Sequence, residues 1–186
     1  MKNEIEMSSQ PLNKSTVERR AYASTSDIVA CFDQERPLLM NLAFLITGDE
    51  FVAAQCVENA RENTLKSRSP FRDWILEWAK TATIQLALLR ATRVIRNFED
   101  AHKRWRCAHD EHLTENGDEA HRFDLQRLTL VDATELVSEL DPLCRAVLVL
   151  RLALRSSIQE CAFRLNVSRL AVIGANCRAM EWLGNE

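Results

Sequence analysis

The sequence predicts an all-α protein with two helical modules joined by a polar linker. Apolar residues recur at helical spacing over several long segments, and no segment shows the two-residue alternation typical of a half-buried strand. Helix start and stop signals, such as Gly48-Asp49 and Asp141-Pro142, separate these segments. We expect a disordered tail at residues 1–25, helical domains at residues 26–98 and 130–186, and the linker at residues 99–129.

The first helical domain is predicted to contain three helical stretches. The first begins near Asp27, is interrupted by Pro37 and stops at Gly48. The second has apolar or small residues at helical spacing, namely Ala53, Cys56, Val57, Ala60 and Thr64. The third begins at Ser69-Pro70, a cap residue followed by proline, and runs to about Phe98. Its predicted buried face consists of Ile75, Trp78, Ala79, Ala82, Leu86 and Leu89, and core packing is expected for Trp74 as well.

The linker is charged and contains an "NGD" turn signal at residues 116–118. Its histidines are His102, His109, His112 and His121, close to Cys107. Their spacing matches no metal-binding motif, so we predict no metal or other cofactor; a zinc or copper site is the alternative.

Basic residues gather around the end of the third helix and the start of the linker. They are Arg90, Arg93, Arg96, Lys103, Arg104 and Arg106, with Trp105 among them. Such a cluster can follow a phosphate backbone while the aromatic ring stacks on an unpaired base. The alternative is a solvated helix end, where cations interact favourably with the helix dipole.

The second helical domain begins with an apolar stripe over Ala133, Leu136, Val137 and Leu140, followed by a strongly apolar helix after Asp141-Pro142. A helix-turn-helix is predicted next. Ser157 and Glu160 form a capping box, Ala162 is small where two such helices pack closest, and Asn166 suits a left-handed turn. Ser168 can cap the second helix. The alternative is an ordinary pair of core helices.

The second helix of this motif would place its exposed face in a DNA groove. The positions expected on that face are Arg169, Leu170, Ile173, Gly174, Cys177, Arg178 and Glu181. Only two of these residues are cationic, so few phosphate contacts are expected.

Bulk properties exclude several classes of protein. The net charge of −3 does not by itself indicate a nucleic-acid-binding protein, and no apolar run is long enough to cross a membrane. The six cysteines include no CxxC pair, which argues against a disulfide framework, and most should act as small apolar residues in a reducing compartment. No catalytic constellation is present and the N-terminus has no apolar core typical of a signal peptide, so we expect a cytoplasmic, non-enzymatic protein.

Two separated blocks resemble the bacterial extracytoplasmic-function (ECF) sigma factors of the sigma-70 class. Residues 42–90 are similar to region 2 of that family, with Gly48-Asp49, Ala53 and the "RDWILEWAK" segment carrying the match. Residues 140–183 resemble region 4, whose helix-turn-helix binds the −35 promoter element. The matching residues there are Leu140, Pro142, Arg145, Ala146, Val147, Leu148, Glu160, Ala162, Leu165, Ser168, Val172, Arg178 and Leu183.

The resemblance implies a transcription initiation factor that binds core RNA polymerase and promoter DNA, with an anti-sigma factor as a further candidate partner. It assigns polymerase binding to Gln55, Glu58 and Asn59. It assigns promoter contacts in the region 2-like domain to Trp74, Thr81, Gln85, Arg90 and Arg93. In the region 4-like domain, it assigns them to Ser168, Arg169, Ile173, Asn176 and Arg178.

Several contact positions depart from the family pattern. Thr81 and Gln85 stand where the family often has Asn and Asp, and Ile173 and Ala175 stand where it has Lys or Arg. The residues matching its acidic polymerase-binding pattern also include fewer carboxylates. The alternative function is therefore a degenerate sigma-like interaction module that regulates a partner without sequence-specific DNA binding.

Overall fold

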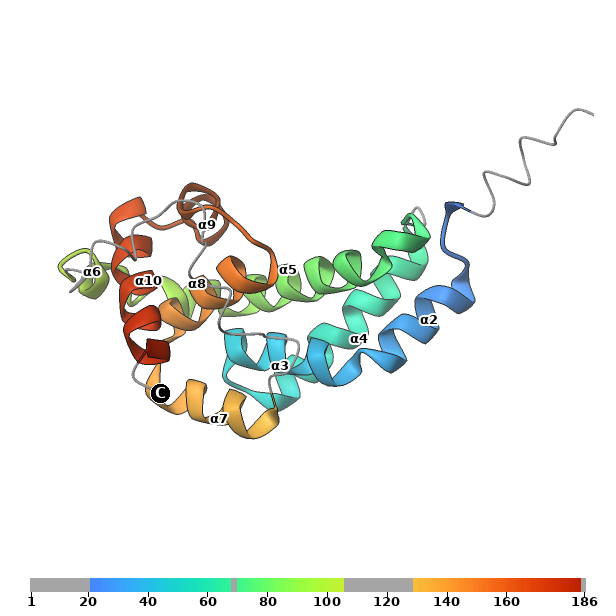
Figure 1. The fold of residues 1–186 in the computed structure, drawn as a ribbon, viewed down its shortest axis with the longest axis horizontal. Coiled ribbons are helices and arrows are strands. Elements are labelled where there is room, and N and C mark those ends of the chain that lie inside the picture. The colour runs from blue at the N-terminus through green and yellow to red at the C-terminus, as the bar shows by residue number, and fades with distance from the viewer. Residues whose placement is uncertain (1–20, 68–69, 106–128, 185–186) are drawn as a thin grey trace, which may run out of the picture.

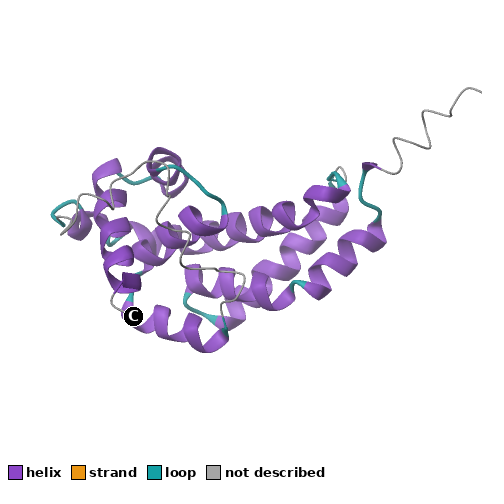
Figure 2. Cartoon of the chain, viewed as in Figure 1, coloured by secondary structure: helices purple, strands orange, loops and turns teal. Residues whose placement is uncertain are grey.

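The computed structural model describes residues 21–67, 70–105 and 129–184, and its regular elements over these ranges are helices (Figures 1 and 2). This result confirms the all-α prediction. The elements are α2 (Thr25–Gln34), α3 (Arg36–Thr47), α4 (Glu50–Lys66), the 3-10 turn η1 (Arg72–Trp74), α5 (Ile75–Arg96), α6 (Glu99–His102), α7 (Leu130–Glu139), α8 (Pro142–Ala153), α9 (Ile158–Leu165) and α10 (Arg169–Gly184).

Helices α2, α3 and α4 begin and end at residues with clear local causes. Ser24 caps α2 through a capping box with Asp27, and Pro37 occupies the first turn of α3. Pro37 therefore starts a new helix after a break at Glu35. Gly48 ends α3 with a φ of 69°, and Asp49 caps α4 by accepting a hydrogen bond from the Val52 N–H. The buried face predicted for α4 is confirmed in full, from Ala53 to Thr64.

The predicted buried face of α5 is confirmed in part: Ala79 is buried, and Ile75, Ala82 and Leu86 are half-buried against the core. The buried residues of α5 are Ala79, Lys80, Thr83, Ile84, Ala87, Leu88, Ala91 and Ile95. Leu89, which was expected inside, is 72% exposed. The helix is apolar on more than one side, so periodicity alone placed the predicted stripe at the edge of the true contact face. The predicted start at Ser69-Pro70 lies partly outside the described residues, and the helix itself begins at Ile75 after η1.

Two helices joined by a short turn, α9 and α10, form where the helix-turn-helix was predicted. Ser157 and Glu160 make the capping box of α9, and Asn166 ends the helix in the left-handed conformation with φ 51° and ψ 49°. The Ser168 hydroxyl accepts a hydrogen bond from the Ala171 N–H at 3.3 Å. Ala162 is buried between the helices. These local predictions are confirmed.

The N-terminal and C-terminal helices share one hydrophobic core. Helix α8 packs against α3 and α5, and α7 also contacts α3 (Figure 1). Arg145 of α8 is buried beside the turn at Gly48, where a Cβ atom would lie 3.3 Å from the guanidinium nitrogens. Burial lowers the pKa of Arg145. Residues from both sequence blocks thus meet in space, while the predicted domain boundaries stay a prediction.

The structure also bears on the predictions that most cysteines act as small apolar residues and that no segment crosses a membrane. Cys31, Cys56, Cys144 and Cys161 are free and buried, as expected of small apolar residues. Cys177 is also buried but is disulfide-bonded. Over the described ranges, no helix combines the length and the apolarity that a membrane span requires.

Candidate nucleic-acid interface

An exposed stripe runs along α5 on the side that faces away from the core. It begins at Trp74 and continues through Trp78 and Gln85 at helical spacing, with the half-buried Thr81 between them. Trp74 is 67% exposed and Trp78 is 45% exposed, so the prediction that both pack in the core is wrong. The structure therefore places Trp74, Thr81 and Gln85 along one side of the helix, with Trp74 and Gln85 exposed and Thr81 half-buried.

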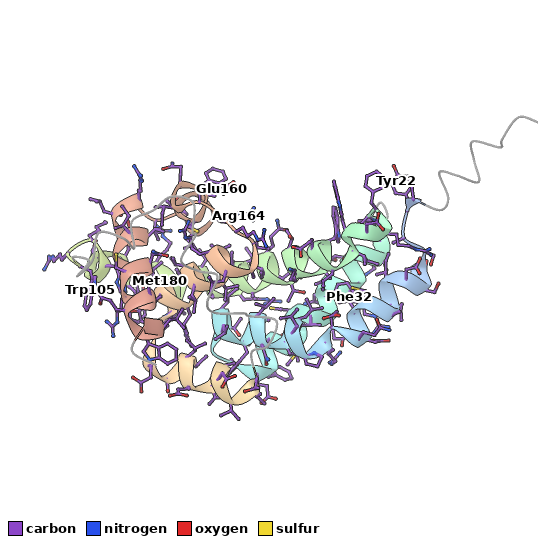
Figure 3. All side chains as sticks on the ribbon, viewed as in Figure 1. Tyr22, Phe32, Trp105, Glu160, Arg164 and Met180 are labelled. Carbon is purple, nitrogen blue, oxygen red and sulfur yellow. The ribbon has the colours of Figure 1, made fainter. Side chains whose placement is uncertain are left out.

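The stripe begins in a cluster of exposed aromatic rings, formed by Tyr22, Phe71 and Trp74. The Tyr22 and Phe71 rings stack with centroids 4.7 Å apart, and Trp74 meets Phe71 edge-on at 5.8 Å. Figure 3 labels Tyr22 at the end of the molecule where this cluster lies. The sequence did not single out Tyr22 and Phe71, because the two residues are distant in the sequence. A single backbone bridge brings them together in the structure.

Local interactions hold the aromatic cluster in place. The Arg72 guanidinium donates to the Asp27 carboxylate at 2.8 Å, which ties η1 to the first turn of α2. The hydrogen bond from Arg72, followed by those from Ser24, lowers the pKa of Asp27 to about 2. Asp27 therefore stays ionised at neutral pH and keeps the cluster attached to α2.

The other end of α5 is basic. Arg90, Arg93 and Arg96 are all exposed. Beyond them, Lys103 pairs with Glu99 at 3.1 Å and Asp100 at 2.9 Å. The last member of the predicted basic cluster, Arg106, lies outside the described residues. An aromatic start and a basic end on the same helix match the two contacts that single-stranded nucleic acid makes, base stacking and phosphate pairing.

Helix α9 lies beside the middle of this stripe. An open groove between the two helices is lined by Gln85, Leu88, Leu89 and Thr92 of α5 and by Gln159, Glu160, Phe163 and Arg164 of α9. Figure 3 labels Glu160 and Arg164 on α9 above α5. A ligand that follows α5 from Trp74 towards Arg93 would therefore pass α9.

Part of the face of α10 that was expected to meet DNA, around Gly174, is covered by α6 and Trp105. Gly174 and Cys177 are buried, so the prediction that they are exposed is wrong. A Cβ atom on residue 174 would lie 2.2 Å from the His102 carbonyl oxygen and 3.0 Å from the Trp105 Cβ. The Arg178 guanidinium lies 5.4 Å from the Trp105 ring centroid, within cation–π range.

Glu99 of α6 also contacts the N-terminus of α10. The Ser168 N–H donates to the Glu99 carboxylate at 3.0 Å. This hydrogen bond is the main reason that the pKa of Glu99 is lowered. A helix N-terminus is a favourable position for a phosphate. At the N-terminus of α10, the Glu99 carboxylate occupies this position.

The structure places the region 4-like residues in different environments. Arg169 is exposed, Ser168 and Arg178 are half-buried, Ile173 is half-buried against the core, and Asn176 is buried. These five residues therefore do not form one accessible DNA-binding face in this arrangement. Leu170 remains 61% exposed next to Arg169.

The predicted polymerase-binding residues lie on the outer face of α4. Gln55 and Asn59 are exposed, whereas Glu58 forms ion pairs with Arg36 and Arg61. Phe51 lies one turn before Gln55 and is 72% exposed. The sequence analysis did not single out Phe51. The available signal was that Phe51 is apolar but does not fall on the buried stripe of α4.

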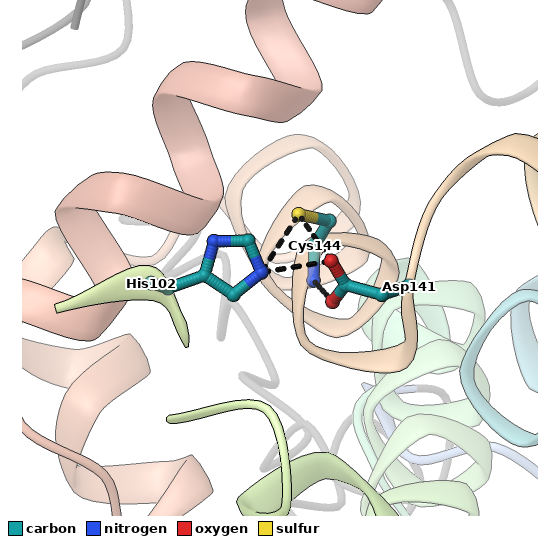
Figure 4. Close-up of side chains that lie close together, drawn as sticks. All are labelled: His102, Asp141 and Cys144. Atoms are coloured by element: carbon teal, nitrogen blue, oxygen red, sulfur yellow. Dashed lines mark hydrogen bonds and ion pairs between the residues drawn. The ribbon is translucent and has the colours of Figure 1, made fainter. Parts of the chain in front are cut away.

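A buried polar cluster joins α6 to the start of α8 (Figure 4). His102 Nε2 lies 2.8 Å from Asp141 Oδ2 and 3.6 Å from the Cys144 sulfur, and the sulfur lies 3.4 Å from Asp141 Oδ2. Burial raises the pKa of Asp141, but the hydrogen bonds from His102 and the Cys144 N–H outweigh it, leaving a pKa of about 2. Burial and the neighbouring carboxylate raise the pKa of the Cys144 thiol far above its usual range.

This cluster is not arranged for nucleophilic catalysis. A reactive thiolate requires a lowered pKa and access to substrate, whereas Cys144 is buried and its pKa is raised. Asp141 and Cys144 both face the same histidine nitrogen, so His102 does not relay between them. Sequence reasoning singled out His102 but missed Asp141 and Cys144, because 39 residues separate His102 from Asp141.

Comparison of the whole chain with protein-family models, with curated proteins and with solved structures finds no match.

Proposed function

We propose that this protein is a sigma-like transcription initiation factor that binds core RNA polymerase through α4 and promoter DNA through α5. The observation that carries the proposal is the exposed surface of α5, which begins at an aromatic cluster around Trp74 and ends among exposed arginines, including Arg90 and Arg93. No catalytic role is part of this proposal, and the protein would act from the bacterial cytoplasm.

The aromatic end of the stripe supports a contact with unpaired bases. Trp74 and Trp78 expose large apolar surfaces on one side of a helix that buries its opposite side. A contiguous patch of exposed apolar side chains typically marks a site of interaction with a partner. Every base has a π-face, so stacking on Trp74 would accept melted DNA of varied sequence.

The basic end supports a contact with the phosphate backbone. Arg90 and Arg93 are exposed at the end of α5, and α5 is 22 residues long. At about 1.5 Å per residue, the helix spans roughly 33 Å, which is enough to reach from several unpaired bases to adjacent duplex. Binding by these arginines would weaken as the salt concentration rises.

The outer face of α4 supports binding to polymerase. Phe51, Gln55 and Asn59 recur at helical spacing and are exposed on a helix whose other side is buried in the core. An exposed phenylalanine surrounded by polar residues is typical of a protein interface with an apolar centre. This face belongs to a different helix from the α5 stripe, so both partners could bind together.

A pull-down of purified core RNA polymerase by the full-length protein tests the proposal. We expect retention of polymerase, and we expect Gln55→Ala with Asn59→Ala to weaken it because both side chains are exposed on the proposed interface. Val131→Ala, which removes an exposed apolar side chain from α7, is the matched control. The proposal would be contradicted if the wild-type protein retained no polymerase.

The second candidate function is a sigma-like interaction module that does not read DNA sequence. The covered face of α10 favours it, because Gly174 packs against α6 and Glu99 holds the N-terminus of the helix. This alternative predicts that the protein binds a protein partner but shows no preference among DNA sequences at any salt concentration. A sequence-dependent affinity for promoter fragments would count against it.

A further inference from the structure

We propose that His102, Asp141 and Cys144 form a binding site for one divalent transition-metal ion, with Zn²⁺ the best match. One potential ligand atom from each residue lies within 4.8 Å of the other two (Figure 4). An imidazole nitrogen, a carboxylate oxygen and a sulfur are the three ligand types that zinc accepts in proteins. This site is separate from the α4 and α5 surfaces and does not depend on the function proposed for them.

The distances between the ligand atoms are close to those of a tetrahedral site. Zinc bonds of about 2.0–2.3 Å at tetrahedral angles place ligand atoms about 3.3–3.5 Å apart. The Cys144 sulfur lies 3.6 Å from His102 Nε2 and 3.4 Å from Asp141 Oδ2. The remaining separation, 2.8 Å between His102 and Asp141, is a hydrogen-bond distance and would lengthen by about 0.5 Å when an ion replaces the shared proton.

The ligand-bearing side chains are already oriented. Asp141 caps α8 through Oδ1, which accepts hydrogen bonds from the N–H groups of Leu143 at 3.0 Å and Cys144 at 3.1 Å. These bonds leave Oδ2 directed at His102 and Cys144. Hydrogen bonds of this kind to a ligating carboxylate position it and increase metal affinity. Three protein ligands leave a fourth tetrahedral position for water, and the Asp141 side chain is partly exposed.

His102 would ligate the ion through its Nε2 atom. Its side chain is 2% exposed, and its Nδ1 atom has no hydrogen-bond partner within the described part of the chain. An ion bound at Nε2 would take the place of the contacts that this nitrogen makes with Asp141 and Cys144. Upon metal binding, the Cys144 thiol proton would leave to solvent and the imidazole proton would move from Nε2 to Nδ1.

The ion would connect two elements that are distant in the sequence. His102 lies on α6, which covers α10, whereas Asp141 and Cys144 lie at the start of α8. Metal binding would therefore fasten α6 in the position where it covers Gly174. Loss of the ion would loosen the cover of α10, which gives the site a regulatory consequence.

Titration of the full-length, metal-free protein with Co²⁺ tests the site, because cobalt reports its ligands by absorption. We expect one ion per chain, a sulfur-to-cobalt charge-transfer band and the visible bands of a tetrahedral ion. Cys144→Ser should abolish the sulfur band, and His102→Ala should weaken binding at least about tenfold. Cys161→Ser, which alters an equally buried thiol in α9, is the matched control and should leave both signals unchanged.

Two further variants keep the outcome decisive. Asp141→Asn keeps an oxygen that can cap α8 but removes the charged ligand, so it should weaken Co²⁺ binding at least about tenfold even if Cys144→Ser does not fold. His109→Ala combined with His112→Ala changes the linker histidines and should leave binding intact. The proposal is overturned if the wild-type protein binds neither Co²⁺ nor Zn²⁺, or if only the linker variant loses the ion.

Discussion

Replacing Gly174 by alanine is expected to detach α6 from α10 and to destabilise the protein. The added Cβ would lie 2.2 Å from the His102 carbonyl oxygen, and a backbone atom cannot move aside as a flexible side chain can. Overpacking of this kind typically costs about 1–3 kcal/mol. The better helix propensity of alanine offsets up to about 1 kcal/mol of that loss. Denaturant unfolding measures the net change, which we expect to lower the free energy of unfolding.

Hydrogen exchange locates the effect of this substitution. Amides of α6 and of the covered face of α10 should exchange faster in the Gly174→Ala protein, while those of α3 and α4 should not change. Leu170→Ala is the matched control, because residue 170 lies on the same helix but is exposed. Surface changes usually alter stability by no more than about 0.5 kcal/mol. An unchanged exchange rate in α6 would show that α10 is not covered as described.

Replacing Trp74 by alanine is expected to weaken binding of single-stranded promoter DNA by about 5- to 160-fold. The expected loss is the stacking of one base on an aromatic ring, about 1–3 kcal/mol. Stability should change little in comparison, since the ring is mostly exposed and contacts Phe71 edge-on. Fluorescence anisotropy of a labelled single strand, measured at several salt concentrations, gives the affinity.

Phe51→Ala provides the matched control for Trp74→Ala. Both substitutions remove an exposed aromatic ring, but Phe51 lies on α4 and Trp74 lies at the start of α5. The proposed division of surfaces predicts that Phe51→Ala weakens polymerase binding and spares DNA binding, whereas Trp74→Ala does the reverse. Equal losses of DNA affinity in both variants would contradict the assignment of α5 as the DNA-binding helix.

The parts of the fold that depend on neighbouring residues were predictable from the sequence. The capping box at Ser157 and Glu160 and the left-handed Asn166 are local features, and the structure has both. The buried face of α4 follows from a single apolar stripe. On α5, Leu89 and Trp78 were wrongly placed in the core because they fit a regular apolar stripe, and only the packing of α3, α4 and α8 against α5 decides which side of the stripe is buried.

The candidate sites depended more on contacts between distant segments. Nothing near Gly174 in the sequence reveals that the His102 carbonyl packs against it, although a glycine inside a helix often marks a close approach of another backbone. The aromatic cluster needs Tyr22 and Phe71 to meet, and the metal site needs α6 to reach α8. On α5, by contrast, Thr81 and Gln85 were identified from the family resemblance and Arg90 and Arg93 also from the cluster of basic residues; Gln85 and both arginines are exposed, and Thr81 is half-buried.

Run-off transcription with purified core RNA polymerase tests the central claim most directly. The template is a pool of DNA fragments from the genome that encodes the protein, so no promoter sequence needs to be assumed. The proposed function predicts that core polymerase alone starts at no defined positions, that addition of the protein yields transcripts with defined 5′ ends, and that Trp74→Ala reduces their amount. Transcripts that are identical with and without the protein would contradict a role in transcription initiation.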